Sequence, residues 1–214
     1  MYDLALVLFD MDGVLVDTIP PLKQTYLNVA RHLGVKQPSE QELGKVMQIG
    51  PGKALKELFG EDVTEIKATF NRHWRTNIDT VPCFEGVTEM LKSLSSSGIT
   101  LGTVTSRNSL DTYSLLDAAG IRTYMQIIVT WGHYRVAKPS PTCLMVALSR
   151  TDKPPNMTAY VGDQAMDMLA ARSAGVLAVG AIWDANASED DLRKAGADVI
   201  VKEPKEILAL ALKT

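Results

Sequence analysis

The 214-residue sequence is poor in the residue types that staple small secreted folds or hold zinc. Its two cysteines, Cys83 and Cys143, lie outside any C-x-x-C pattern, so we expect free buried thiols rather than a disulfide or a zinc site. No apolar run approaches membrane-spanning length, and no basic region precedes the apolar stretch at the N-terminus. We therefore expect a cytoplasmic protein without a membrane partner.

The net charge of the chain is also small, and this argues against a protein that binds polyanions. The net charge is −3 and no basic run occurs, so a nucleic-acid surface is not expected. A G-x-x-x-x-G-K-[ST] loop is missing too, which argues against nucleotide-triphosphate binding. Apolar residues make up 46% of the chain, as in globular proteins. The length suits one large domain or a core that carries an inserted one.

The most informative stretch is an apolar run that leads directly into two acids. Residues 4–9 are all apolar, and Asp10-Met-Asp-Gly13 follows them. Such a run predicts a strand buried on both faces of a parallel sheet. Side chains alternate along a strand, so Asp10 and Asp12 should leave it on the same side, at the edge where open α/β sheets bind ligands.

Two carboxylates this close repel each other, so they cannot both be ionised away from water unless something offsets their charge. Either one of them keeps a proton, or a cation neutralises the pair. The first case supplies a nucleophile beside an acid/base, and the second supplies a site for a hard metal ion. An ordinary acidic turn after a strand is the third interpretation, and this stretch alone leaves all three open.

Hydrophobic patterns divide the chain into an all-helical block and an alternating block. Residues 18–81 predict helices only, at 20–33, 39–47, 53–59 and 64–75. Residues 82–214 alternate helices with strands, and strands are expected at 100–105, 125–130, 159–161, 177–182 and 198–201. Helices in this block are expected at 87–94, 110–119, 138–148, 165–174, 189–195 and 206–212.

This alternation predicts an α/β fold with a doubly wound, Rossmann-like parallel sheet. Residues 1–17 and 82–214 should form the core. Residues 18–81 should be an inserted helical domain, placed after the first strand, where it can act as a lid.

Polar residues follow several of the predicted strands. Thr105 ends the second strand and Ser106 follows it, and Asp163 and Asp167 follow the fourth strand. Lys138 stands just before a predicted helix. Several acids suit magnesium, which takes oxygen ligands, whereas hydroxyl, N–H and ammonium groups suit a bound phosphate.

These segments resemble the four motifs of the haloacid dehalogenase superfamily. The matching segments are Phe9–Thr18, Val104–Ser106, Lys138–Pro141 and Val161–Asp167, and the helical insertion resembles that superfamily's small helical cap. The resemblance covers the whole chain and implies a Rossmann-like core with Mg²⁺ as cofactor. Within the superfamily it is strongest to phosphoglycolate phosphatase-like and pyrophosphatase-like members.

The resemblance also implies a role for each matching residue. Asp10 would be the nucleophile that forms an aspartyl-phosphate, and Asp12 the acid/base. The phosphoryl group would be held by Thr105, Ser106 and Lys138. The metal would be bound by Asp10, the Asp12 carbonyl and Asp163, with Asp167 as a supporting ligand or partner. One departure is Gln164, where a serine or threonine is common, and it bears on the metal's surroundings.

The leading hypothesis is a magnesium-dependent phosphatase for a small phosphorylated metabolite, working as a monomer or homodimer. A sugar phosphomutase of the β-phosphoglucomutase type is the first alternative, although the histidine usual in that type is missing from Ile19–Thr25. A receiver-like phosphoacceptor that is not an enzyme is less favoured, because it has no use for Asp12 or the insertion.

Specificity is expected to come from the insertion, because the core motifs recognise only phosphate and metal. The candidate is Ile49–Ala54, in which Gly50 and Gly52 can present N–H groups and Lys53 adds a positive charge. Such a loop suits an anionic leaving group, as in phosphoglycolate. An ordinary helix break with a solvated lysine is the alternative.

Overall fold

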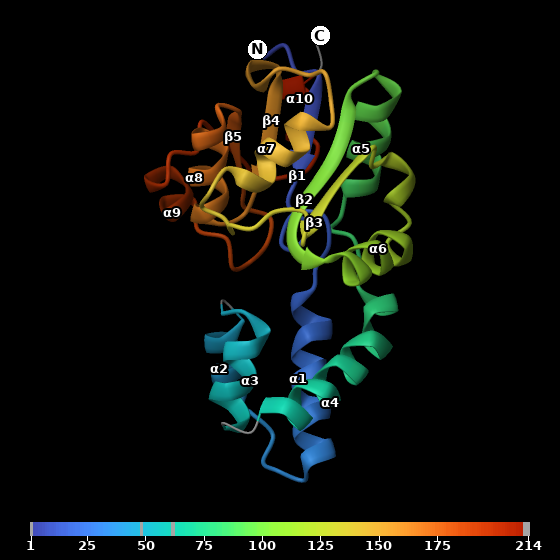
Figure 1. Cartoon of the computed structure of the whole chain (residues 1–214), viewed down its shortest axis with the longest axis vertical. Coiled ribbons are helices and arrows are strands. Elements are labelled where there is room, and N and C mark those ends of the chain that lie inside the picture. The colour runs from blue at the N-terminus through green and yellow to red at the C-terminus, as the bar shows by residue number, and fades with distance from the viewer. Residues whose placement is uncertain (1, 48, 61–62, 212–214) are drawn as a thin grey trace. The chain divides into compact units, whose positions relative to one another are not determined.

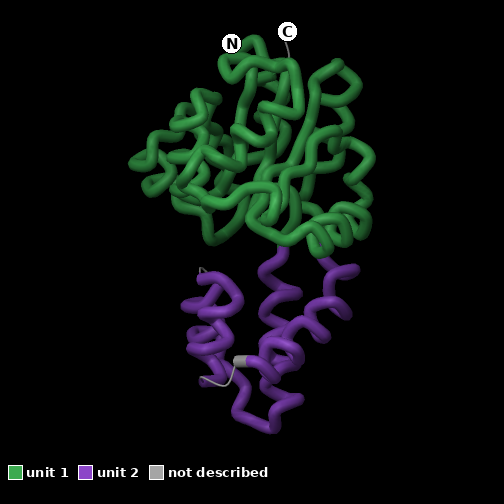
Figure 2. The backbone as a smooth tube through the Cα atoms, in the orientation of Figure 1, with its two compact units in different colours: residues 1–17, 82–214 green, residues 18–81 purple. Residues whose placement is uncertain are grey.

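The computed structural model describes residues 2–47, 49–60 and 63–211. The chain forms two compact units, Met1–Asp17 with Pro82–Thr214, and Thr18–Val81 (Figure 2). The chain thus leaves the first unit after its first strand and returns to it at Pro82.

The first unit is built on a six-stranded sheet in which all neighbouring strands are parallel (Figure 1). The strand order is β3-β2-β1-β4-β5-β6. The strands are β1 (Leu6–Phe9), β2 (Thr100–Asn108), β3 (Ile127–Trp131), β4 (Thr158–Gly162), β5 (Leu177–Ala181) and β6 (Val199–Val201). This α/β architecture is the one that the sequence predicts.

Helices cover both faces of this sheet. They are α5 (Val87–Ser96), α6 (Ser109–Ala118), α7 (Thr142–Ser149), α8 (Ala165–Ala174), α9 (Glu189–Lys194) and α10 (Glu206–Ala211), with short 3-10 turns at Arg122–Tyr124 and Pro155–Met157. All four residues of β1 are fully buried, so both of its faces are covered. Leu6 and Leu8 share one apolar cluster with residues of α7, α8 and α9. An uninterrupted apolar run is what such a doubly covered strand requires.

The order of the strands marks where a ligand is expected. The chain moves outward from β1 to β2 and β3, and then crosses to β4, β5 and β6 on the other side. This reversal puts β1 and β4 side by side at a topological switch point, where open α/β sheets bind ligands beyond the carboxyl ends of their strands. Asp10 and Asp163 directly follow these two strands.

The predicted strands are all present, with bounds that shift by a few residues. The largest difference is β2, which was expected to end at residue 105 and continues to Asn108. Its pairing with β3 shifts register between Val104 and Asn108, an irregularity of the kind that redirects side chains near a site. The helix expected to end at Leu212 is described as far as Ala211, and Leu212 lies outside the described residues.

The second unit consists of α1 (Ile19–Leu33), α2 (Glu40–Val46), α3 (Pro51–Phe59) and α4 (Val63–Asn77), followed by a 3-10 turn at Ile78–Thr80. Helix α2 begins with the expected capping box between Ser39 and Glu42. The rings of Tyr26 on α1 and Phe70 on α4 lie 5.3 Å apart, and Asn77 Nδ2 donates to Thr25 Oγ1 at 3.0 Å. Helices α1 and α4 therefore pack directly against each other. Among the described helices of the whole chain, none has the length and apolar character needed to cross a membrane.

Candidate active site

The first strand carries Asp10 to the carboxyl edge of the sheet. Only 8% of this residue is exposed. Its Oδ1 accepts a hydrogen bond from the Met11 N–H, and its Oδ2 accepts one from Lys138 Nζ, both at 2.8 Å. The carboxylate is thus held from two sides and has a basic partner.

Lys138 is the centre of the hydrogen-bond network around Asp10. Its ammonium donates to Asp10 Oδ2, to Asp167 Oδ1 at 2.6 Å, and to the Tyr160 hydroxyl at 3.0 Å. The Tyr160 hydroxyl in turn donates to the Val104 carbonyl at 3.0 Å. Lys138 itself is buried. One ammonium therefore ties β1, β4 and α8 together at the strand ends.

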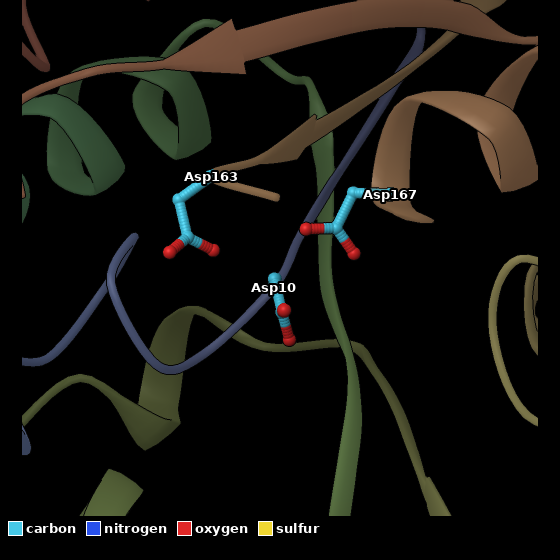
Figure 3. A group of neighbouring side chains, drawn as sticks. All are labelled: Asp10, Asp163 and Asp167. Carbon is cyan, nitrogen blue, oxygen red and sulfur yellow. The ribbon is translucent and has the colours of Figure 1, made fainter. Parts of the chain in front are cut away.

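Three carboxylates converge at this edge. Figure 3 shows Asp163 and Asp167 turned toward Asp10, and one oxygen from each of the three lies within 4.8 Å of the others. Asp163 follows β4, and Asp167 lies in the first turn of α8. The expected convergence of acids from separate strand ends is thus present.

Gly162 is the residue that lets α8 come this close. A β-carbon on Gly162 would lie 2.3 Å from Asp167 Cβ and 2.6 Å from Asp167 Cγ. Any larger residue would push the Asp167 carboxylate away from Lys138. The glycine therefore maintains the position of this acid.

Burial and repulsion from neighbouring acids make Asp10 and Asp163 reluctant to ionise. Burial raises the pKa of Asp10 to about 7, against the attraction of the Lys138 ammonium. Burial, together with Asp167 and Asp10, raises the pKa of Asp163 to about 9. Burial lowers the pKa of Lys138, but Asp10 and Asp167 outweigh this and raise it overall. The side chains alone thus leave the negative charge of the acids incompletely balanced.

These residues fit a divalent metal ion. Three carboxyl groups face one ammonium, so when all three are ionised they carry an excess of two negative charges. Asp163 Oδ1 is buried and has no hydrogen-bond partner among the described residues. A buried carboxylate oxygen without a partner is costly unless a cation binds it. An all-oxygen donor set of this kind suits a hard cation such as Mg²⁺.

Both oxygens of Asp167 accept hydrogen bonds, as both oxygens of Asp10 do, whereas Asp163 Oδ1 has no partner among the described residues. Asp167 Oδ1 accepts from Lys138, and Asp167 Oδ2 accepts from the Gln164 N–H at 3.0 Å. Asp167 is also completely buried. Asp167 therefore fixes the position of the Lys138 ammonium and stabilises the start of α8. Gln164, which departs from the family pattern, contributes to this arrangement through its main-chain N–H.

Asp12 does not belong to the three-acid group, and its carboxylate pairs with Arg107 instead. Arg107 Nε donates to Asp12 Oδ2 and Arg107 Nη2 donates to Asp12 Oδ1, both at 2.7 Å. From the sequence we considered a proton or a metal as the means of reconciling Asp10 with Asp12. In the structure the two acids each have a basic side chain, Lys138 for one and Arg107 for the other.

The two hydroxyl residues at the end of β2 have different surroundings. Thr105 is buried, and its Oγ1 accepts a hydrogen bond from the Arg107 N–H at 3.2 Å. Ser106 is exposed. Both lie at the sheet edge that carries Asp10, and their binding of phosphate stays a prediction.

The loop proposed for specificity lies in the second unit. Gly50 precedes α3, and Gly50, Gly52 and Lys53 are all exposed. The N–H groups of Lys53 and Ala54 donate to the Gly50 carbonyl, at 2.9 and 3.1 Å, as at a regular helix start. The role of this loop also stays a prediction.

Two residues at this edge of the sheet, Arg107 and Tyr160, were not identified as site residues from the sequence. Arg107 stands directly after Ser106, but we expected the strand to end at Thr105 and read no role into the following arginine. Tyr160 lies within a strand that the sequence predicts to be apolar. A tyrosine buried two residues before a strand-end glycine needs a partner for its hydroxyl, and this was the available signal.

Comparisons with known proteins agree with this geometry. The family model for haloacid dehalogenase-like hydrolases matches residues 7–181. A phosphoglycolate phosphatase from Xanthomonas campestris is 29% identical over 206 residues, which cover 94% of this chain and 93% of the relative. The pyrophosphatase PpaX from Bacillus pumilus is 28% identical over 209 residues, which cover 95% and 94% respectively.

A solved structure shares the fold over almost the whole length. It is that of a protein from Thermotoga maritima named "putative beta-phosphoglucomutase", with a TM-score of 0.86 and 27% identity. The match covers 97% of this chain and 98% of the other.

Proposed function

The chain belongs to the haloacid dehalogenase-like hydrolases and is a phosphatase, and we propose that it hydrolyses a small phosphorylated metabolite through an aspartyl-phosphate on Asp10, with Mg²⁺ as cofactor. The observation that carries this proposal is the environment of Asp10. Its carboxylate is buried at the switch point of the sheet and bonded to Lys138, next to two further acids.

In the first step, a carboxylate oxygen of Asp10 attacks the phosphorus of the substrate. The bond from phosphorus to the ester oxygen breaks, and Asp12 gives that oxygen a proton. Lys138 keeps Asp10 oriented and offsets negative charge on the phosphoryl oxygens. Thr105 and Ser106 offer hydroxyl and N–H donors to the same oxygens.

In the second step, water attacks the phosphorus of the aspartyl-phosphate and Asp12 takes a proton from it. The bond between phosphorus and the Asp10 oxygen breaks, which releases inorganic phosphate and restores the carboxylate. Asp10, Asp163 and the Asp12 carbonyl would hold a divalent cation, which would supply positive charge to offset the repulsion between the anionic phosphate and the anionic nucleophile. Asp167 supports this arrangement by fixing Lys138.

A phosphoglycolate-like substrate is favoured within this class. Relatives at 29% identity bear the name phosphoglycolate phosphatase, and Lys53 with its glycines suits a leaving group that carries its own negative charge. The helical unit, residues 18–81, would then act as the cap that selects the substrate. A pyrophosphatase is the next candidate, because diphosphate also presents a second anionic group, and a relative bears that name.

A phosphomutase remains the alternative, since the matched solved structure carries such a name. The two activities differ in their products. A phosphatase releases phosphate from the substrate, whereas a mutase returns a phosphorylated isomer without net release.

The test is a panel of phosphorylated metabolites assayed for phosphate release with Mg²⁺ and with excess chelator. Asp10→Asn should abolish turnover in a folded protein. Asp152→Asn is the matched control, because Asp152 is an exposed acid paired with Lys153 and precedes β4, whereas the site lies beyond the carboxyl end of that strand. Full activity of Asp10→Asn, or of the wild type in chelator, contradicts the proposed mechanism.

A further inference from the structure

We propose that Arg107 is a positioning residue for Asp12, which fixes the orientation of the carboxylate that exchanges a proton with the leaving group and then with water. This inference rests on the proposed function, because it assigns Asp12 the acid/base role. Arg107 lies outside the four segments that resemble the family motifs.

The geometry of the pair is that of a planar fork. Two parallel hydrogen bonds of 2.7 Å join the guanidinium to both oxygens of the Asp12 carboxylate. A single ammonium contact would leave the carboxylate free to rotate, whereas a bidentate guanidinium fixes its plane as well as its distance. The pair therefore determines where both Asp12 oxygens point.

The pair is shielded enough for this orientation to hold. The side chain of Arg107 is 19% exposed and that of Asp12 is 34% exposed. Ion pairs open to water are weak and change partners readily, but partial burial and two-point contact restrain this one. The remaining exposure of Asp12 leaves room for a leaving group to reach it.

The backbone of β2 explains why Arg107 is in place. The strand continues past Thr105 through a register shift, and the Arg107 N–H donates to Thr105 Oγ1. Arg107 is thereby anchored to a residue proposed to bind phosphate. Its side chain then reaches across to the segment after β1, 95 residues away in sequence. Two neighbouring strand ends are joined through the acid/base.

Asp12 lies at a sharp turn of the chain, and Arg107 contacts its carboxylate from outside that turn. Asp12 follows β1 and directly precedes Gly13, whose φ of +73° turns the backbone sharply. Proton transfer requires an oxygen within hydrogen-bond reach of the leaving oxygen. Other acids near Arg107, namely Asp10 and Asp111, also attract its charge, but the bidentate contact is with Asp12.

The test compares leaving groups that differ in their need for a proton. The catalytic efficiency kcat/KM is measured with Mg²⁺ on the best alkyl phosphate of the panel and on p-nitrophenyl phosphate. An alkoxide leaves only with a proton from an acid, whereas p-nitrophenolate leaves unaided. Arg107→Ala should lower kcat/KM on the alkyl phosphate by about 10- to 100-fold, the loss typical when a supporting partner is removed. The loss on p-nitrophenyl phosphate should be much smaller.

Two further variants and one rescue experiment make the result specific. Arg107→Lys keeps the charge without the fork and should fall between wild type and Arg107→Ala. Arg122→Ala, which breaks an exposed pair with Asp117, is the matched control and should behave as wild type. Free guanidinium ion, added below the concentration that unfolds the protein, should restore activity to Arg107→Ala and leave Arg122→Ala unchanged.

A double substitution separates positioning from direct contact with substrate. The burst of p-nitrophenol in Asp12→Asn should be unchanged when Arg107→Ala is added. A further loss in the double variant would mean that Arg107 binds the substrate itself, and would overturn the inference. Equal losses on both leaving groups, with a lowered unfolding temperature, would reduce Arg107 to a structural role and also overturn it. If the wild type releases no phosphate from any substrate, the proposed function fails instead.

Discussion

Gly13 and Asp163 lie so close together that a β-carbon on Gly13 would stand 2.3 Å from Asp163 Oδ2. The turn after β1 therefore comes directly against the carboxylate that follows β4. Gly13 also has a φ of +73°, a conformation that side chains disfavour. One residue thus meets two requirements, a left-handed turn and space for a proposed metal ligand.

Gly13→Ala should weaken metal binding as well as stability. Gly98→Ala is the matched control, because Gly98 has a φ of +79° and the described residues leave open space around its β-carbon position. Both variants should lose roughly 1–2 kcal/mol of unfolding free energy through backbone strain. Only Gly13→Ala should raise the Mg²⁺ concentration that gives half-maximal activity. An unchanged Mg²⁺ requirement in Gly13→Ala would show that Asp163 is not needed in this position.

The metal-free protein should lose stability as the pH rises. The folded-state pKa of Asp10 is raised to about 7 and that of Asp163 to about 9, from 3.8 in both cases. Above the unfolded pKa the unfolded chain releases these protons while the folded chain retains them, so unfolding becomes easier with each pH step up to the folded pKa. In chelator, the unfolding temperature should fall between about pH 5 and pH 9.

Asp163→Asn removes the larger of these two contributions and should flatten the pH profile in chelator. Asp152→Asn changes an exposed acid and should leave the profile as it is in the wild type. Mg²⁺ should raise the unfolding temperature more at high pH than at low pH, because it binds the ionised acids. A wild-type profile that rises with pH in chelator would contradict the burial of these acids.

Lys138→Ala should be costly for the fold as well as for turnover. It leaves Asp10 and Asp167 facing each other without the ammonium between them, and losing one partner of a buried ion pair costs about 3–5 kcal/mol. Thermal unfolding measures the first effect and phosphate release the second. A variant with wild-type stability would mean that these acids do not depend on the ammonium.

Tyr160→Phe should have a smaller effect of the same kind. It removes the hydroxyl that accepts from Lys138 and donates to Val104, at a cost of about 1 kcal/mol. A moderate fall in kcat without a change in KM is expected, since Lys138 loses one of its three partners. Tyr124→Phe removes the same group from a 3-10 turn outside the site and is the control. Equal effects of the two substitutions would exclude a role for the Tyr160 hydroxyl in orienting Lys138.

Lys53→Ala tests the proposed specificity loop. Catalytic efficiency should fall on phosphoglycolate, whose leaving group is anionic, and stay the same on an alkyl phosphate with a neutral leaving group. Lys67→Ala, at another exposed lysine of the helical unit, should affect neither substrate. Equal losses on both substrates, or none on either, would return Lys53 to the role of a solvated charge at a helix start.

Much of the fold could be predicted because its signals are local. The uninterrupted apolar run before Asp10 predicts a strand covered on both faces, and β1 is buried throughout. Ser39 with Glu42 predicts a capped helix start, and α2 begins with that capping box. The position of Gly34 predicts the end of α1, where it has a φ of +65°. Each of these features depends on residues within a few positions of one another.

Side-chain partners were harder to predict because they join distant segments. Lys138 carried no sign in the sequence of being buried, yet it lies among Asp10, Tyr160 and Asp167. Arg107 was overlooked because β2 was expected to end at Thr105, before the register shift that places the arginine. Such partners become neighbours only when strands far apart in sequence pair in the sheet.

The order of residues alone was therefore enough to determine an α/β chain with acids, hydroxyls and a lysine at the ends of its strands. Periodicity reports which faces are buried, and polar residues directly after apolar runs report where strands stop. Only the tertiary structure decided which base serves which acid, Lys138 for Asp10 and Arg107 for Asp12. The physical reason is that ion pairing depends on distances of a few ångströms between side chains, and these are set by the packing of the sheet and its helices.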